Sequence, residues 1–511
     1  MKLKPRAGLV ENPNPAPMTM RFLAPLILLV LLLAAPGGLP DAWAAGPPLL
    51  AQAESDDDLA SGFDDGEEQN EGQKSDDDDL SSGFEDEPGV KDAEAKTATE
   101  PSFWQVNGFL RLDGSYNYAR PAPAAGETDH RGLSKLRAAL RLELSLKLGG
   151  SWKSKITGQA FHDFAYGLNG REQYTGQVLE SREQEAELRE AFVEGSLTEN
   201  VDLKLGRQIV VWGKSDNIRI TDILNPLDFR EPGLTDLADL RLPLTMSRLG
   251  VFFGPWTVSA IAIHEIRFDK APVLGSDFYP LKTETAEAIP DDGGENTEYA
   301  FSLSGEFSGW DLAYYRARVF DDAAYFASLG GGAFERRHAR ISMNGLGVNV
   351  ALGNWLLKLE GARFTGLRFF QGGARRFTRY DGVLGLEYSG IGDTTLSLEA
   401  ANRHLAGFDK ALEAAPDGQV ENVNQYVFTY RGSFLREKLD LVAVLIYFGR
   451  KAEQGSLQRY SATYELAEAL DLTGGVVLYT RGDGENFLLA AAKDNDRVFF
   501  DLKWSFYIPF S

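Results

Sequence analysis

Charged residues cluster in one irregular segment of the chain, VVWGKSDNIRITDILNPLDFREPGLTDLADLRLP, Val210–Pro243, which lacks the alternation of a β-strand. Its charged residues are Lys214, Asp216, Arg219, Asp222, Asp228, Arg230, Glu231, Asp236, Asp239 and Arg241. Opposing fixed charges across a narrow aqueous passage order water and select solutes by charge and size. The composition of the segment therefore suits the constriction of a channel.

The segment also contains the residues that a sharply bent loop requires. Gly213 permits an abrupt departure from a strand, Pro226 and Pro232 stiffen the path, and Asn225 or Asp228 can hydrogen-bond to nearby backbone. The alternative is an ordinary extracellular loop pinned by salt bridges among these charges, with Trp212 as an aromatic anchor at the membrane interface.

Catalytic chemistry finds little support in the sequence. The five histidines are scattered, and none lies in a recognised hydrolase motif. His162 and Asp163 are adjacent on an expected strand, so they point to opposite faces. The absence of cysteine excludes disulfides and thiolate metal sites. We therefore predict a protein that is not an enzyme and has no cofactor or metal; a nucleophile and base meeting at one rim is the alternative left open.

From residue 103 onward the sequence alternates with a period of two. In WQVNGFLRLDGSYNYA, Trp104–Ala119, and KLRAALRLELSLKL, Lys135–Leu148, apolar and polar residues take turns, which puts one face against apolar surroundings and the other against water. Such segments are about ten or more residues long, the length that a tilted strand needs to cross a bilayer. The outward residues are leucine and aromatic to a degree that is unusual for a soluble sandwich.

The connections between the expected strands alternate strictly in length. Short links such as Gly149–Gly150 and Gly353–Asn354 alternate with long ones such as 168–184, 212–244 and 269–296. Tight turns on one rim and long loops on the other are typical of outer-membrane barrels. We therefore predict an all-β, antiparallel transmembrane barrel of about 18 strands (16–18) over residues 103–511, with both termini periplasmic. The 212–244 link is its third long connection, which in general porins folds into the lumen.

Two segments precede the expected barrel. Residues 1–44 are predicted to be a signal peptide, with an apolar run from Phe22 to Ala35 and a start at Met18 or Met20 as an alternative. Residues 45–102 are predicted to be a disordered acidic periplasmic arm, because Glu54–Glu100 holds 19 acids against three lysines. The phrase SDDD-L-x-SGF occurs twice in this arm, as a spacer or as a docking repeat for a periplasmic partner. The anchors of the docking repeat would be Leu59, Phe63, Leu80 and Phe84.

Basic residues occupy expected lumen positions on the first strands. Arg111, Arg137 and Arg141 form a predicted lumen basic stripe. Arg316, Arg318 and Arg403 are expected to add to its positive charge, and Glu194, Glu360 and Glu399 to reduce it. A basic wall concentrates anions and favours their passage.

The alternation at the end of the chain resembles the recognition signal of outer-membrane proteins, although Phe510 is penultimate and Ser511 follows it. The expected partners are therefore outer-membrane lipids, the barrel assembly machinery, a periplasmic partner of the acidic arm and, as a further option, other copies in a homo-oligomer. The net charge of −23 disfavours nucleic acid.

A resemblance rests on R-Q-x-V-x-W-G-x-[ST]-[DE] followed by N-P-x-D. Its residues here include Arg207, Trp212, Gly213, Asn225, Pro226 and Asp228. The motif is similar to one found in a poorly characterised family of proteobacterial outer-membrane, porin-like barrels. The resemblance implies a porin-like barrel, whose relatives are suspected of partnering inner-membrane transporters in moving lipid or hydrophobic compounds. Two functions follow: passive passage of small solutes, with the third long connection as constriction, or one component of a transport assembly for hydrophobic cargo.

Overall fold

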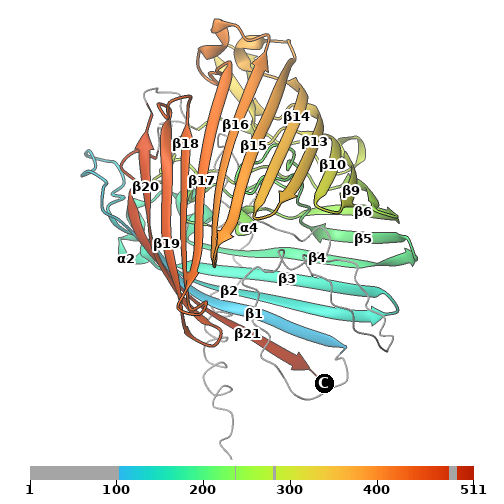
Figure 1. Ribbon diagram of the computed structural model, residues 1–511. Coiled ribbons are helices and arrows are strands. Elements are labelled where there is room, and N and C mark those ends of the chain that lie inside the picture. The colour runs from blue at the N-terminus through green and yellow to red at the C-terminus, as the bar shows by residue number, and fades with distance from the viewer. Residues whose placement is uncertain (1–102, 236, 280–283, 483–488, 490–491, 511) are drawn as a thin grey trace, which may run out of the picture. The chain divides into compact units, whose positions relative to one another are not determined.

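The computed structural model describes residues 103–235, 237–279, 284–482, 489 and 492–510. The predicted signal peptide (1–44), acidic arm (45–102) and docking repeat lie outside the described residues. Within the described residues, 18 strands pair in one antiparallel sheet, and the first strand, Trp104–Asn117, also pairs with the last, Arg497–Phe510. The sheet is therefore a closed barrel, which confirms the predicted fold class and strand number (Figure 1).

The barrel strands follow the alternating segments of the sequence. They are β1 (Trp104–Asn117), β2 (Gly132–Gly149), β3 (Trp152–Asp163), β4 (Gln184–Thr198), β5 (Val201–Gln208), β6 (Leu244–Phe253), β7 (Trp256–Ile263), β9 (Glu298–Phe307), β10 (Trp310–Phe320), β13 (Arg340–Leu352), β14 (Trp355–Leu367), β15 (Phe377–Ile391), β16 (Thr394–Ala406), β17 (Asn422–Phe434), β18 (Leu439–Phe448), β19 (Gly455–Ala467), β20 (Leu470–Arg481) and β21 (Arg497–Phe510).

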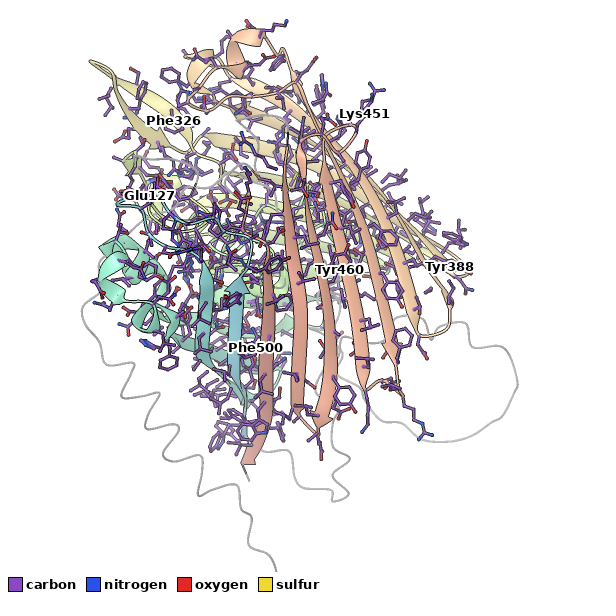
Figure 2. All side chains as sticks on the ribbon, turned by 90° about the vertical axis from the view of Figure 1, so that its left-hand side faces the viewer. Glu127, Phe326, Tyr388, Lys451, Tyr460 and Phe500 are labelled. Carbon is purple, nitrogen blue, oxygen red and sulfur yellow. The ribbon has the colours of Figure 1, made fainter. Side chains whose placement is uncertain are left out.

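Short turns and long connections alternate as predicted. The long connections leave the strands at one rim and carry the remaining elements. Lys451 and Phe326, labelled in Figure 2, belong to two of these connections, whereas Tyr388 lies near a short turn. Their elements are α2 (Ala165–Leu168), η1 (Arg171–Gln173), α3 (Gly176–Arg182), α4 (Leu237–Leu240), η2 (Gly294–Asn296), η3 (Phe370–Gly372), η4 (Lys410–Glu413) and a small sheet of β8 (Glu287–Ala288), β11 (Tyr325–Gly330) and β12 (Ala333–Arg337). Among the described residues no helix has the length and apolarity needed to cross a membrane.

The outer face of the barrel is apolar. Leu142, Leu346, Leu384 and Leu398 are exposed in the middle of their strands, where every second residue points outward. Aromatic side chains gather near the short turns, as in the stacked pair Phe307 and Trp310 (centroids 4.2 Å apart). An apolar belt edged by aromatic residues is the surface that a bilayer solvates.

Candidate functional site: a connection inside the barrel

The connection between β5 and β6, residues 209–243, is called the third connection below. It contacts strands on opposite sides of the barrel. Its Asp239 forms a salt bridge with Arg141 of β2 (2.6 Å), whereas its Asp216 forms one with Lys358 of β14 (2.5 Å). Its Pro232 carbonyl accepts a hydrogen bond from the Tyr479 hydroxyl of β20. Because the sheet is closed, a segment that touches opposite walls must run through the interior.

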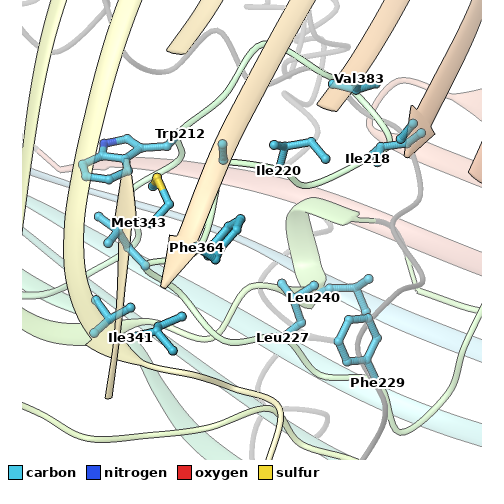
Figure 3. Close-up of a cluster of buried hydrophobic side chains, with 14 of the residues drawn as sticks. Trp212, Ile218, Ile220, Leu227, Phe229, Leu240, Ile341, Met343, Phe364 and Val383 are labelled. Carbon is cyan, nitrogen blue, oxygen red and sulfur yellow. The ribbon is translucent and has the colours of Figure 1, made fainter. Parts of the chain in front are cut away.

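On one side the third connection packs against an apolar wall. Trp212 is buried and lies against Tyr315 of β10, with ring centroids 5.0 Å apart. Farther along the connection, Ile218 and Ile220 belong to the same buried cluster as Met343 of β13. Figure 3 shows Met343 next to Trp212, with Ile220 and Ile218 farther from it. Apolar wall residues of other strands belong to the same cluster, namely Phe364, Val383, Val427, Ile446, Leu457 and Val477. This part of the barrel interior is therefore packed like the core of a globular protein.

Two wall glutamates hold the start of the connection. The Glu360 carboxylate (β14) accepts hydrogen bonds from the backbone N–H of Lys214 (2.7 Å), and from the backbone N–H (2.6 Å) and hydroxyl (2.8 Å) of Thr221. The Glu399 carboxylate (β16) accepts from the Ser215 hydroxyl and from the next two backbone N–H groups, at 2.7–3.0 Å. The irregular backbone thus finds its partners on the wall, as buried N–H groups must.

On the opposite side the connection is held by ion pairs. Glu231 lies 2.5 Å from the Lys135 ammonium, 3.0 Å from the Arg137 guanidinium and 3.1 Å from that of Arg182. Burial opposes ionisation, but the three cations outweigh it and hold the pKa of Glu231 well below its usual range. Asp239 pairs with Arg141 and lies 3.6 Å from Arg111, so the predicted lumen basic stripe faces acids of the third connection.

The motif residues close the base of the connection. Asn225 is fully buried; its side-chain oxygen accepts from the Val210 N–H (2.8 Å) and its amide donates to the Leu242 carbonyl (2.8 Å). The Pro226 carbonyl accepts from the Leu242 N–H (2.7 Å). Gly213 has φ 104°, and a Cβ there would lie 2.9 Å from the Glu360 carboxylate. A residue other than glycine would therefore be strained and crowded at this position.

The other predicted constriction residues are also ion-paired. Lys214 pairs with Asp311 of β10, Arg219 with Asp222 (3.0 Å), and Arg230 with both Asp228 (2.5 Å) and Glu185 of β4 (2.7 Å). The remaining motif residue, Arg207, pairs with Glu265 in the connection that follows β7. These charges fasten the connection to the wall and to itself.

The structure corrects two interpretations of the sequence. Trp212 is buried in the lumen, so it is not an aromatic anchor at the membrane interface. Arg316 and Arg318 do not join the lumen stripe. On β10 the residues buried against the interior are Tyr315 and Ala317, which alternate with the two arginines, so the arginines point outward. Arg403 does face inward, where it donates to the Arg219 carbonyl (3.1 Å).

Sequence reasoning missed the role of Glu360 and Glu399, although it placed both in the lumen. A signal was present, since both glutamates stand at inward positions beside apolar inward residues such as Ala362 and Ala401. An acid in that setting needs a partner. Its partner, an irregular backbone far away in the chain, has no signature in the strands themselves. Among the described residues, no group of histidines and carboxylates could hold a metal ion.

Asp269, in the connection after β7, provides a pH-dependent contact with the third connection. Its buried carboxylate accepts from the Leu227 N–H (2.6 Å), and burial raises its pKa to about 6, with Asp321 adding to the shift. The carboxyl group of Asp269 ionises at a lower pH in the unfolded chain than in the folded one. It therefore favours the folded state most below about pH 4, and this contribution to stability falls by on the order of 3 kcal/mol as the pH rises through 6. Asp269→Asn is expected to remove that loss.

Urea midpoints of the refolded barrel between pH 4 and 7 test this expectation, because the difference between wild type and Asp269→Asn cancels the carboxylates that do not interact with Asp269. Asp409→Asn, in the exposed connection after β16, is the matched control. The urea midpoint of Asp269→Asn should rise relative to that of wild type as the pH rises. A difference in midpoint that stays constant from pH 4 to 7 would contradict the expectation.

A closed antiparallel barrel with an apolar belt and an inward connection defines the class: this is an outer-membrane β-barrel with the porin fold. A BenF-like porin from Pseudomonas fluorescens Pf-5 has this fold, with a TM-score of 0.50 and 11% identity over 79% of this chain and 99% of that chain. OccK9 (OpdG) of Pseudomonas aeruginosa matches with a TM-score of 0.48 and 13% identity, over 80% of this chain and 100% of that chain. OccAB1 of Acinetobacter baumannii matches with a TM-score of 0.47 and 11% identity, over 82% of this chain and 99% of that chain.

The chain belongs to the family described as "protein of unknown function (DUF1302)", whose sequence profile matches residues 113–506. No curated protein matches the sequence.

Proposed function

We propose that the protein is an outer-membrane channel for the passive passage of small solutes, in which the third connection forms the constriction. The observation that carries this proposal is the attachment of residues 209–243 to opposite walls of a closed barrel, through Asp239 to β2 and through Asp216 to β14. A segment held in this way narrows any path along the barrel axis. Fixed charges beside the path would then select solutes by charge.

The proposed constriction residues are those that fasten the connection: Lys214, Asp216, Arg219, Asp222, Asp228, Arg230 and Glu231. Because these charges are paired, the passage presents alternating positive and negative groups rather than one uncompensated sign. The proposed passage is therefore narrow, and a solute meets both positive and negative groups in it. The proposal includes no catalytic step.

A second function, the passage of a hydrophobic or lipid cargo in an assembly with periplasmic or inner-membrane transporter proteins, has one observation in its favour. The wall formed by β17, β18 and β20 is apolar, with Val427, Ile446 and Val477 fully buried, and the wall at β2 is cationic at Arg137 and Arg141. If the connection moved aside, the lumen would offer an apolar and a basic face, which suits an anionic amphiphile. In that case the acidic arm would recruit the partner.

Single-channel recording of the refolded mature protein in a planar bilayer tests the first function. A variant in which a short Gly-Ser linker replaces Asp216–Asp239 is expected to conduct severalfold more than wild type, because the obstruction is gone. The control shortens another long connection by deleting residues 410–418, and it should conduct like wild type.

The two functions predict different results. Stable wild-type conductance that rises on deletion supports the solute channel. If neither protein conducts, while the deletion variant transfers a fluorescent fatty acid between vesicles, the second function is supported instead. Equal conductance of wild type and the deletion variant would contradict the role of the third connection.

A further inference from the structure

A basic groove lies on the outer face of the barrel, across β9, β10, β13 and β14. On β10 the side chains of Tyr315 and Ala317 are buried against the interior, so Arg316 and Arg318 point outward, and both are exposed. On β14 the buried Ala362 and Phe364 flank Arg363, which is also outward and exposed. Figure 1 shows β10, β13 and β14 side by side.

The register brings these cations together. Arg316 pairs with Asn344 of β13, and Asn344 pairs with Arg363 of β14. Neighbouring strands lie about 4.8 Å apart, so the Cα atoms of Arg316 and Arg363 are about 10 Å apart across β13. Together with Arg318, Arg340 and Arg376, these arginines line a groove of about 900 Å³. Its apolar edge includes Tyr299 and Phe301 of β9, both exposed.

The outward arginines differ from the inward ones in their partners. Inward cations such as Arg137, Arg141 and Lys358 pair with carboxylates of the third connection at 2.5–3.0 Å. Across the part of the chain that the structure describes, Arg316, Arg318 and Arg363 have no carboxylate within salt-bridge distance. An arginine on the lipid face is costly unless it lies at the headgroup level or meets an anion.

The position along the strands identifies that level. Outward residues of β10 begin at the short turn with the exposed Trp310, continue through Leu312 and Tyr314, and change to arginine only at Arg316. On β14 the outward series starts at Trp355, another exposed aromatic, and becomes basic at Arg363. Both changes occur toward the long-connection rim, which faces the cell exterior in outer-membrane barrels. The groove therefore lies where the outer leaflet presents its headgroups.

We propose that this groove binds the phosphate groups of a phosphorylated outer-leaflet lipid. Guanidinium groups recognise phosphate by paired, charge-assisted hydrogen bonds, and three arginines within one groove can hold two phosphates. The exposed Tyr299 and Phe301 offer apolar surface for the acyl chains of the same molecule. The lipid thereby supplies the anionic partners that the strands themselves do not provide. The proposal depends on the membrane position of the barrel and not on what passes through its lumen.

Native mass spectrometry of the refolded protein in a non-ionic detergent, titrated with lipid A carrying two phosphates, tests the proposal. The variant Arg316→Gln/Arg318→Gln/Arg363→Gln is expected to bind at least tenfold more weakly than wild type. The control Lys410→Gln/Arg450→Gln/Lys451→Gln removes the same charge from exposed connections and should bind like wild type. Arg316→Lys/Arg318→Lys/Arg363→Lys keeps the charge and should lose less affinity than the glutamine variant.

Two further arms separate the sources of binding. Dephosphorylated lipid A should bind wild type as weakly as phosphorylated lipid A binds the glutamine variant, and millimolar inorganic phosphate should compete only slightly. Equal binding by the glutamine variant and its control would overturn the proposal, as would undiminished binding of the dephosphorylated lipid. Heat-dependent gel mobility reports folding of each variant, and Arg363→Gln alone, expected to bind more weakly than wild type, replaces the triple variant if that variant does not fold.

Discussion

Replacing Glu231 with glutamine is expected to weaken the docking of the third connection by about 3 to 5 kcal/mol, a factor of more than a hundred in its equilibrium. The glutamine occupies nearly the same volume but removes the single negative charge shared by Lys135, Arg137 and Arg182. Two of these cations, Lys135 and Arg182, are almost completely buried. Without Glu231 they would keep only longer contacts, Lys135 with Asp113 at 3.3 Å and Arg182 with Asp277 at 3.6 Å, so the interior would hold an excess of positive charge, which is costly.

Trypsin provides the measurement, because Arg219 and Arg230 lie inside the third connection and their side chains are only 17% and 12% exposed while it is docked. The Glu231→Gln protein should be cleaved there at least a hundredfold faster than wild type, and single-channel records should show frequent visits to a larger conductance. Glu413→Gln, which alters an exposed carboxylate in the connection after β16, is the matched control. Cleavage of both variants at the wild-type rate would mean that the ion pairs do not hold the connection.

Removing both wall glutamates, as Glu360→Ala/Glu399→Ala, is expected to destabilise the docked connection by about 4 kcal/mol or more. The two carboxylates accept hydrogen bonds from four backbone N–H groups, at Lys214, Asp216, Asn217 and Thr221, and from two hydroxyls. Without the two carboxylates these donors lose their partners on the wall. Each buried donor that loses its partner costs roughly 1 to 3 kcal/mol, and water entering the cavity recovers part of that cost.

The effect should appear at the start of the connection and leave the barrel intact. Hydrogen exchange is expected to accelerate in residues 213–221, while the strand amides of β14 and β16 stay protected. Glu194→Ala is the matched control, because Glu194 is a buried wall glutamate whose partners are Lys153 and Lys204 and not the third connection. Unchanged exchange in residues 213–221 of the double variant would rule out a role for the two glutamates.

Asn225 shows how far a local motif could be interpreted from the sequence. The sequence predicted that Asn225 hydrogen-bonds to backbone, and it does, but its partners are Val210 and Leu242 at the two ends of the connection. The spacing of a motif predicts that a side chain hydrogen-bonds to the backbone of a turn. It does not reveal that the same amide joins two segments 32 residues apart, because that contact exists only when both strands stand in the barrel.

Arg316 and Arg318 show where single-sequence reasoning failed. Strand periodicity predicts which residues share a face, and the two arginines do share one. The face itself was assigned wrongly, because charged residues were assumed to point into the lumen. With a side-chain period of two, a phase error of one residue exchanges the two faces of a strand. The burial of Tyr315 against Trp212 decides the phase, and that contact joins residues about a hundred positions apart.

The sequence by itself determined the strand number, the alternation of short and long connections and the membrane-facing belt, because each follows from the local spacing of apolar and polar residues. Only the tertiary structure decided where the third connection lies. Its partners, Arg137 on one wall and Glu360 and Glu399 on the other, are brought near it by closure of the sheet between β1 and β21. Closure couples strands from opposite ends of the chain, so the contacts that hold the connection depend on the whole barrel and have no local signature.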